Sequence, residues 1–307
     1  MDWYKYCRHC CVYMFLKLRG SIVRVLIGYE GSRIEDDALN DLDYAGFPED
    51  VEFDILSVSE SPPADGDKDE AVGGAVHAKD LTQRLRFLKI PAETPSASAG
   101  NEILDRSKAF EPDLIVLGGG STLDGNIVSL RNTCKKILTQ SGCSVRIARG
   151  NPGRDESPPR IVIGYDGSPG ARGAVEAVVA RHWPPNTQVR LVVVTDGSVL
   201  NSIGRFSPQM ANPRIEAKIA SQWAATLAEG VLKRLKDAGL KATLCVEAGS
   251  PKQVLVKVAE SWNADSIFVG PHCIGNPVEP LLLGSVSANV AAYAHCSVEI
   301  VRLPAIH

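Results

Sequence analysis

The sequence predicts an α/β protein built from two copies of one unit, each a parallel sheet flanked by helices. Three observations carry this prediction: the length, an internal repeat, and the alternation of strand and helix patterns. A chain of 307 residues has room for roughly two domains of about 150 residues, each able to bury its own core. Hydrophobic residues make up 44% and charged residues 22%, which is typical of globular proteins and excludes fibrous and disordered classes.

The repeat is anchored at three places that follow in the same order. The matching segments are V-L-I-G-Y-E-G-S at 25–32 with I-V-I-G-Y-D-G-S at 161–168, D-L-I-V-L-G at 113–118 with D-S-I-F-V-G at 265–270, and C-S-V-R-I-A-R at 143–149 with C-S-V-E-I-V-R at 296–302. Position 25 matches 161 and position 113 matches 265, so the second copy carries about 16 extra residues in its middle. Three anchors in one order indicate two copies of a single fold.

The domain boundaries follow from the repeat. Residues 150–159 contain glycines, prolines and charges without apolar periodicity, a composition typical of a linker. The first domain is therefore expected at 21–149 and the second at 160–303. Residues 1–20 hold only a short apolar run and no cleavage site, so we expect a poorly ordered N-terminal extension rather than a signal peptide. One hypothesis for its origin is translation that starts upstream of Met14.

Strand and helix patterns alternate along the second copy, which indicates a parallel sheet covered on both faces. The predicted strands are 160–165, 189–195, 242–247, 266–270 and 297–302, and the predicted helices are 171–182, 213–238, 251–262 and 285–294. Gly239 is expected to end the long helix. Four-residue spacing on that helix places Trp223, Leu227 and Val231 in the core.

Charge, cysteine use and hydropathy exclude several function classes. The net charge of -3 provides no basic field for nucleic acid or an anionic membrane, and no run approaches the 20 or so apolar residues of a membrane span. Several of the eight cysteines lie in apolar strand-like runs, which favours free thiols in a reducing cytoplasm. The cluster Cys7-Arg8-His9-Cys10-Cys11 has no second Cys/His pair at finger-like spacing, so no structural metal is expected.

Two loops of the second copy suit an anionic ligand. Ligands bind beyond the carboxyl ends of parallel strands, where the strand order reverses. The first strand is followed by Gly164-Tyr165-Asp166-Gly167-Ser168, and the fourth by a loop that starts at Gly270 and reaches Gly284-Ser285-Val286-Ser287 at a helix start. Glycines permit close approach of the backbone, and the first N–H groups of a helix can hold phosphate oxygens.

These motifs resemble the universal stress protein family, whose nucleotide-binding members carry Gly, two residues, Gly, nine residues and Gly-Ser or Gly-Thr after the fourth strand. The resemblance covers both copies. It implies two tandem Rossmann-like domains of the adenine-nucleotide α hydrolase-like group, each a five-stranded parallel sheet of order 3-2-1-4-5. It also implies that ATP or ADP, with or without Mg²⁺, binds in the second domain. The residues carried over are Gly164, Asp166 and Val194 around the adenine side, and Gly270, Gly275, Gly284, Ser285, Val286 and Ser287 around ribose and phosphates.

The sequence also departs from the family pattern. Gly270 and Gly284 are 14 positions apart where the family has 13, and Cys273 stands in the place of the second glycine, with Gly275 as a candidate substitute. In the first copy, Arg131-Asn132 replaces the Gly-Ser pair and Glu30 replaces the aspartate. We therefore expect a degenerate site in the first domain.

Three functions remain open at this point. The leading one is a stress-response protein that binds adenine nucleotide and passes its occupancy to an unknown protein partner. The loop 270–284 contains no lysine, and phosphoryl transfer normally needs a charged clamp, so no catalytic residue is assigned. The alternatives are an interaction protein with both sites decayed and a slow ATPase or nucleotidyl-transfer enzyme. From the family, the two copies are expected to pair through 144–149 and 297–302 as an intramolecular pseudo-dimer, and a homodimer stays open.

Overall fold

The computed structural model describes residues 23–29, 41–42, 44–48, 51–57, 85–89, 99–119, 130–149, 157–195, 213–271 and 283–302. The chain divides into two compact units: unit 1 is Met1–Gly153 with Arg302–His307, and unit 2 is Arg154–Val301. The division at Gly153 falls within the segment 150–159 that the sequence assigns to a linker. The predicted extension 1–20 and its cysteine cluster lie outside the described residues.

Unit 1 contains a five-stranded sheet in which every pair is parallel. The strand order is β3-β2-β1-β4-β5, so the first strand is central and the fourth lies beside it. Helices α3 and α4 pack against each other. The elements are β1 (Val23–Tyr29), β2 (Val51–Ser57), β3 (Leu85–Lys89), α3 (Ala99–Phe110), β4 (Leu114–Gly118), α4 (Asn132–Gln140) and β5 (Ser144–Ala148).

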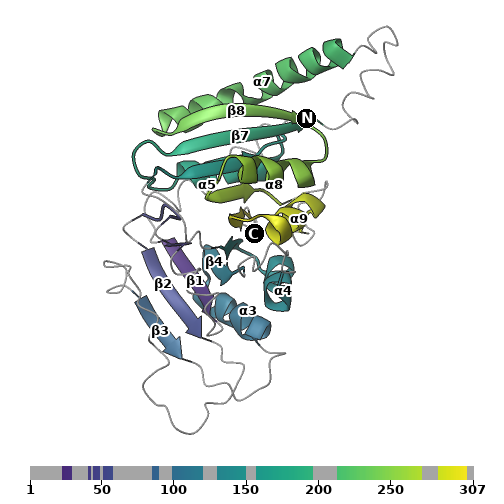
Figure 1. Ribbon diagram of the computed structural model, residues 1–307. Coiled ribbons are helices and arrows are strands. Elements are labelled where there is room, and N and C mark those ends of the chain that lie inside the picture. The colour runs from purple at the N-terminus through teal and green to yellow at the C-terminus, as the bar shows by residue number, and fades with distance from the viewer. Residues whose placement is uncertain are drawn as a thin grey trace, which may run out of the picture. The chain divides into compact units, whose positions relative to one another are not determined.

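Unit 2 repeats this arrangement. Its strand order is β8-β7-β6-β9-β10, again all parallel, so the predicted order 3-2-1-4-5 is confirmed in each unit. The elements are β6 (Arg160–Gly164), α5 (Pro169–Val179), β7 (Gln188–Thr195), α7 (Pro213–Asp237), β8 (Lys241–Ala248), α8 (Pro251–Ser261), β9 (Ser266–Val269), α9 (Ser285–Tyr293) and β10 (Ser297–Ile300). Helix α7 runs alongside β8 (Figure 1).

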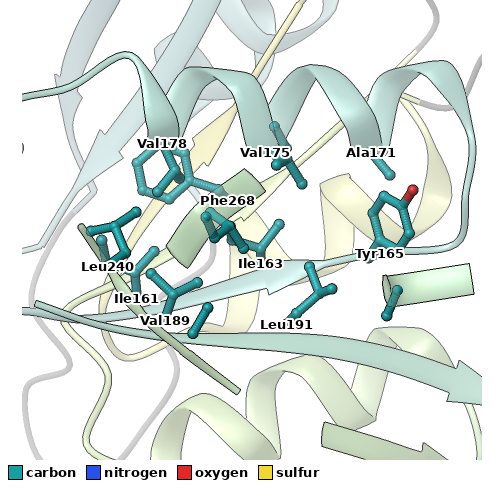
Figure 2. Packing of buried hydrophobic residues seen from close by; sticks show 14 of the residues in the cluster. Ile161, Ile163, Tyr165, Ala171, Val175, Val178, Val189, Leu191, Leu240 and Phe268 are labelled. Atoms are coloured by element: carbon teal, nitrogen blue, oxygen red, sulfur yellow. The ribbon is translucent and has the colours of Figure 1, made fainter. Parts of the chain in front are cut away.

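The helices of unit 2 lie on both faces of its sheet. Side chains of a strand alternate between the two faces, and the neighbours of β6 follow this rule: Ile163 packs in the cluster formed with α5 and α7, whereas Gly164 faces Leu255 of α8. Figure 2 shows Val175 and Val178 of α5 pointing toward Ile163 and Phe268 of the sheet. The strands therefore read as nearly continuous apolar runs because both faces are buried.

The same hydrogen bonds join the first and fourth strands in both units. In unit 1, the Asp113 carboxylate accepts from the Arg24 N–H at 3.0 Å, and the Asp113 N–H donates to the Arg24 carbonyl at 2.8 Å. In unit 2, Asp265 and Arg160 form the equivalent bonds at 2.7 and 2.8 Å. The two aspartates open the second repeat anchor, so this anchor fixes the start of the fourth strand against the first.

One expectation about the core is wrong. Trp223 is 41% exposed, whereas Ala220, Ala224 and Ala228 are buried. Leu227 and Val231 pack only partly against the core. The small alanine side chains let α7 approach the sheet closely, and the indole then lies on the flank of the helix. The predicted end of α7 is confirmed, because Gly239 has a φ of +84°, a conformation that glycine adopts without strain.

Among the described residues, no helix combines the length and the apolar character that crossing a membrane requires.

Candidate functional site

The candidate site lies at the carboxyl edge of the unit 2 sheet, where the winding changes direction. Strand β6 has β7 on one side and β9 on the other, with Ile163 opposite Phe268. The chain leaves β6 toward α5 and leaves β9 toward α9. The two segments that follow these strands thus start side by side, at the place where open α/β sheets bind ligands.

The loop after β6 is a closed turn that presents a carboxylate. The Tyr165 N–H donates to the Val192 carbonyl at 2.9 Å, which continues the β6–β7 ladder past the strand end. One oxygen of Asp166 accepts from the Ser168 N–H at 2.9 Å, and Ser168 Oγ accepts from the Ala171 N–H at 3.1 Å as the N-cap of α5. Gly167 has a φ of +80°. These contacts hold the exposed Asp166 side chain in place.

The adenine side of the predicted site also includes Val194 and Gly164. Val194 is half-buried on β7, two residues beyond the partner of Gly164, so it lies further toward the carboxyl edge. Gly164 faces α8: a Cβ there would lie 3.1 Å from Leu255 Cδ1 and 3.3 Å from Val269 Cγ1. Gly164 therefore lies at the contact between β6 and α8, two residues before Asp166.

The loop after β9 touches the start of α5 backbone to backbone. A Cβ on Gly270 would lie 2.1 Å from the Gly170 carbonyl carbon and 2.6 Å from the Ala171 nitrogen, and a Cβ on Gly170 would lie 2.5 Å from the Pro271 oxygen. Neither position can hold a side chain without a shift of the main chain. The pair Gly170 and Gly270 fixes the start of the glycine loop against the first turn of α5.

Sequence reasoning missed Gly170. Its signal was a glycine placed in the first turn of a helix, in P-G-A-R-G at 169–173. Glycine costs helix stability, so its presence there indicates a close approach by another segment.

Helix α9 begins without a side-chain cap. Gly284 is the N-cap residue with φ −64° and ψ 149°, and no side chain accepts a hydrogen bond there. The first N–H groups of a helix have no intrahelical partners, and Ser285 and Val286 carry two of them. Ser285 is exposed and Val286 half-buried. This helix start carries the partial positive charge that attracts anions.

Ser287 serves the packing of the site. It is buried, and its hydroxyl donates to the Gly270 carbonyl at 2.8 Å. The bond ties the first turn of α9 to the end of β9. The structure thus brings Gly270, Ser287 and the start of α9 together beside the turn after β6, while Gly275, Cys273 and His272 lie outside the described residues.

A phenol and a guanidinium stand beside the Asp166 turn. Burial raises the pKa of the Tyr165 phenol, and the neighbouring Arg172 partly opposes this rise. The phenol therefore stays protonated at neutral pH and can act as a hydrogen-bond donor. Among the described residues, no group of His, Cys, Asp and Glu side chains is arranged to hold a metal ion.

The corresponding helix start in unit 1 has similar N-cap dihedrals and different side chains. Arg131 is the N-cap of α4 with φ −58° and ψ 153°, and it is half-buried. Cys134 occupies the position of Ser287, with its sulfur 3.6 Å from the Gly118 carbonyl. Glu30 lies outside the described residues.

Known proteins are similar to this chain in sequence and in fold. The universal stress protein family profile matches residues 159–302. A Staphylococcus aureus (strain USA300) protein named as a universal stress protein is 31% identical over 144 residues, which cover 46% of this chain and 82% of that protein; the protein of strain NCTC 8325 / PS 47 matches equally.

Solved structures extend the likeness of fold along the chain. A universal stress protein from Archaeoglobus fulgidus DSM 4304 superposes with a TM-score of 0.57 at 18% identity, covering 92% of this chain and 99% of that one. A Pseudomonas aeruginosa UCBPP-PA14 structure also named for this family gives a TM-score of 0.57 at 12% identity, covering 92% and 94%. The identity over most of the S. aureus relative, together with the profile match, shows that the chain belongs to the universal stress protein family.

Proposed function

We propose that unit 2 binds an adenine nucleotide, ATP or ADP, and that the protein is a stress-response regulator which uses this occupancy to bias its contacts with a protein partner. The observation that carries the proposal is the uncapped start of α9 beside the end of β9. At this point the first turn of α9, which carries the N–H groups of Ser285 and Val286, is tied to the end of β9 by the hydrogen bond from Ser287 to the Gly270 carbonyl. A helix N-terminus with glycine beside it is a common phosphate site.

The turn after β6 supplies the other end of the ligand. The exposed Asp166 carboxylate can accept a hydrogen bond from the exocyclic amino group of adenine, because an ionised carboxylate is an acceptor only. Val194 adds an apolar contact at the neighbouring strand end. Gly270 and Gly275 belong to the loop that would pass the ribose. Mg²⁺, if it enters, comes with the phosphates, because the described residues offer no preformed group of metal ligands.

Binding without rapid turnover fits these residues best. The loop 270–284 contains no lysine, and phosphoryl transfer normally uses a charged clamp on the phosphates. A slow ATPase would release ADP steadily. An interaction protein with decayed sites would bind no nucleotide at all.

The test is equilibrium binding of ATP, ADP and AMP to the purified full chain by isothermal titration calorimetry. The key variant is Gly284→Arg, which gives α9 the residue that unit 1 has at the start of α4. We expect its affinity for ATP to fall by at least about tenfold, since the helix N-terminus contributes on the order of 1–2 kcal/mol to anion binding.

The matched control is Gly230→Arg, the same change at a glycine of unit 2 whose Cβ would have nothing within 4 Å. It should bind ATP as the wild type does. Equal affinity of wild type and Gly284→Arg would refute the assigned site. No binding by the wild type would favour the interaction protein, and sustained ADP release from bound ATP would favour the slow enzyme.

A further inference from the structure

The last strands of the two units are nearly the same sequence. Residues 143–149 and 296–302 differ only at Arg146 against Glu299 and Ala148 against Val301. Each strand pairs with the fourth strand of its unit in the same register, with Ser144 opposite Leu114 and Ser297 opposite Ser266. Since the backbone pairing is the same, hydrogen bonds of the main chain cannot tell β5 from β10.

In unit 1 the differing residue is a buried cation. The Arg146 side chain is 0% exposed, and its guanidinium binds Asp41 in a bidentate manner: Nε donates to Oδ2 at 2.5 Å and Nη2 donates to Oδ1 at 2.9 Å. Asp41 is itself buried and lies on the segment that connects β1 with β2.

In unit 2 the charges are reversed. Glu299 is 2% exposed, and its Oε1 accepts from Arg181 Nη2 at 2.5 Å. Arg181 follows α5, on the segment that connects β6 with β7, and its guanidinium also lies 5.1 Å from the centre of the Phe268 ring. The partner again comes from the first crossover of the unit, but here the crossover carries the cation and the strand the anion.

We propose that this reversed pair determines which last strand docks in which sheet. An exchange of β5 and β10, within one chain or between two chains, would bury Arg146 beside Arg181 and Glu299 beside Asp41. Like charges buried together are strongly unfavourable, and natural proteins use such repulsion to exclude wrong partners. Two similar units in one chain are at risk of strand exchange during folding, and the reversed pair raises the energy of the exchanged form. This inference does not depend on nucleotide binding.

The experiment measures strand exchange in the full chain after refolding from urea. Cys143 and Cys296 are first replaced by serine. The reporter pair is Ser144→Cys with Ser266→Cys, which comes within disulfide distance when β5 takes the place of β10 beside β9, since paired strands lie about 5 Å apart. The native reporter is Ser266→Cys with Ser297→Cys. Disulfides are mapped by peptide mass spectrometry.

Three backgrounds are compared. The background with both wild-type ion pairs, Arg146–Asp41 and Arg181–Glu299, should give the native crosslink. The R181E/E299R background keeps an ion pair in unit 2 but gives both units the same charge order, so we expect the exchanged crosslink to rise by at least about tenfold relative to the native one. Adding D41R/R146E reverses unit 1 as well and restores the difference between units, so the exchanged crosslink should fall back to the wild-type level.

An exchanged crosslink that is equally rare in all three backgrounds overturns the proposal, as does failure of the fourfold variant to reverse the rise. If R181E/E299R does not fold, the D41R/R146E background alone serves as the second test, because it also makes the charge order of the two units alike.

Discussion

The starts of α4 and α9 have nearly the same backbone conformation but carry different N-cap residues. The N-cap dihedrals differ by less than about 10° between Arg131 and Gly284, and in both helices the N-cap carbonyl accepts from the N–H four residues later, at 3.0 and 2.9 Å. Gly284 therefore has a conformation that any residue could adopt. Gly284 has no side chain at the helix start, whereas Arg131 carries a long cation at the corresponding position. Backbone conformation therefore does not require a glycine at this position.

The largest expected effect comes from adding a side chain at Gly270, where the main chain of Gly170 already lies in close contact. Gly270→Val would place a Cβ 2.1 Å from the main chain of Gly170. Overpacking against backbone costs about 3 kcal/mol or more of unfolding free energy. Urea denaturation followed by far-UV circular dichroism measures it. Gly142→Ala is the control, because its Cβ would meet nothing within 4 Å; a loss in Gly142→Ala as large as in Gly270→Val would contradict the close contact.

The hydroxyl that ties α9 to β9 has a smaller effect. Ser287→Ala removes the hydrogen bond to the Gly270 carbonyl and should cost about 1–2 kcal/mol, since that carbonyl loses a buried donor. Cys134→Ala in unit 1 removes the sulfur contact with the Gly118 carbonyl at 3.6 Å and should cost less, because a thiol is a weaker donor than a hydroxyl. Chemical denaturation gives the loss of unfolding free energy for each variant. A larger loss for Cys134→Ala than for Ser287→Ala would contradict the expectation that the hydroxyl makes the stronger bond.

Replacing the arginine of unit 1 should hardly change stability. The backbone at Arg131 already matches that of Gly284, and glycine is a favourable N-cap residue, so Arg131→Gly should change the unfolding free energy by less than about 0.5 kcal/mol. Thermal unfolding measures this. A clear loss would indicate that the guanidinium stabilises unit 1, and the comparison of the two starts would then rest on more than free space.

The smallest effect at neutral pH concerns the thiol that precedes β5. Burial raises the pKa of Cys143 from 9.0 to about 12. A group whose pKa is higher in the folded state binds its proton more tightly there, so its contribution to stability is complete below pH 9 and is lost as the pH rises toward 12. Cys143→Ser should therefore weaken the fall of stability between pH 9 and 12 and leave the slope below pH 8 unchanged. Denaturation midpoints of the wild type and of Cys143→Ser are measured across this pH range. An equal loss of stability in the two proteins would contradict the role of Cys143.

The sequence was sufficient for the architecture because its signals are local and repeated. The anchors at 161–168 and 265–270 give strands β6 and β9, and the apolar runs end within one or two residues of the observed strands. The prediction that Trp223 lies in the core was wrong. Residues at four-residue spacing include both the series of Trp223 and the series of Ala224, and the distance between α7 and the sheet decides which series is buried.

The site was harder to predict because its key contacts join distant segments. The contact of Gly170 with Gly270 connects residues 100 positions apart, and no pattern along the chain reveals it. The difference between Arg146 and Glu299 is visible in the repeat, but its meaning depends on Asp41 and Arg181, which are more than 100 positions away along the chain. Binding of nucleotide at Asp166, Val194 and the α9 start stays a prediction.

The tryptophans give the two units different optical signatures. Trp183, Trp223 and Trp262 are the tryptophans of the described residues, and all belong to unit 2. Trp183 donates to the Val178 carbonyl at 2.7 Å, and Trp262 lies under Arg190 at 4.2 Å, whereas Trp223 is 41% exposed. In a Trp3→Phe background, intrinsic fluorescence would follow the melting of unit 2 alone while circular dichroism follows both units. Two noncoincident transitions would then reveal, without any label, that the halves unfold in separate steps.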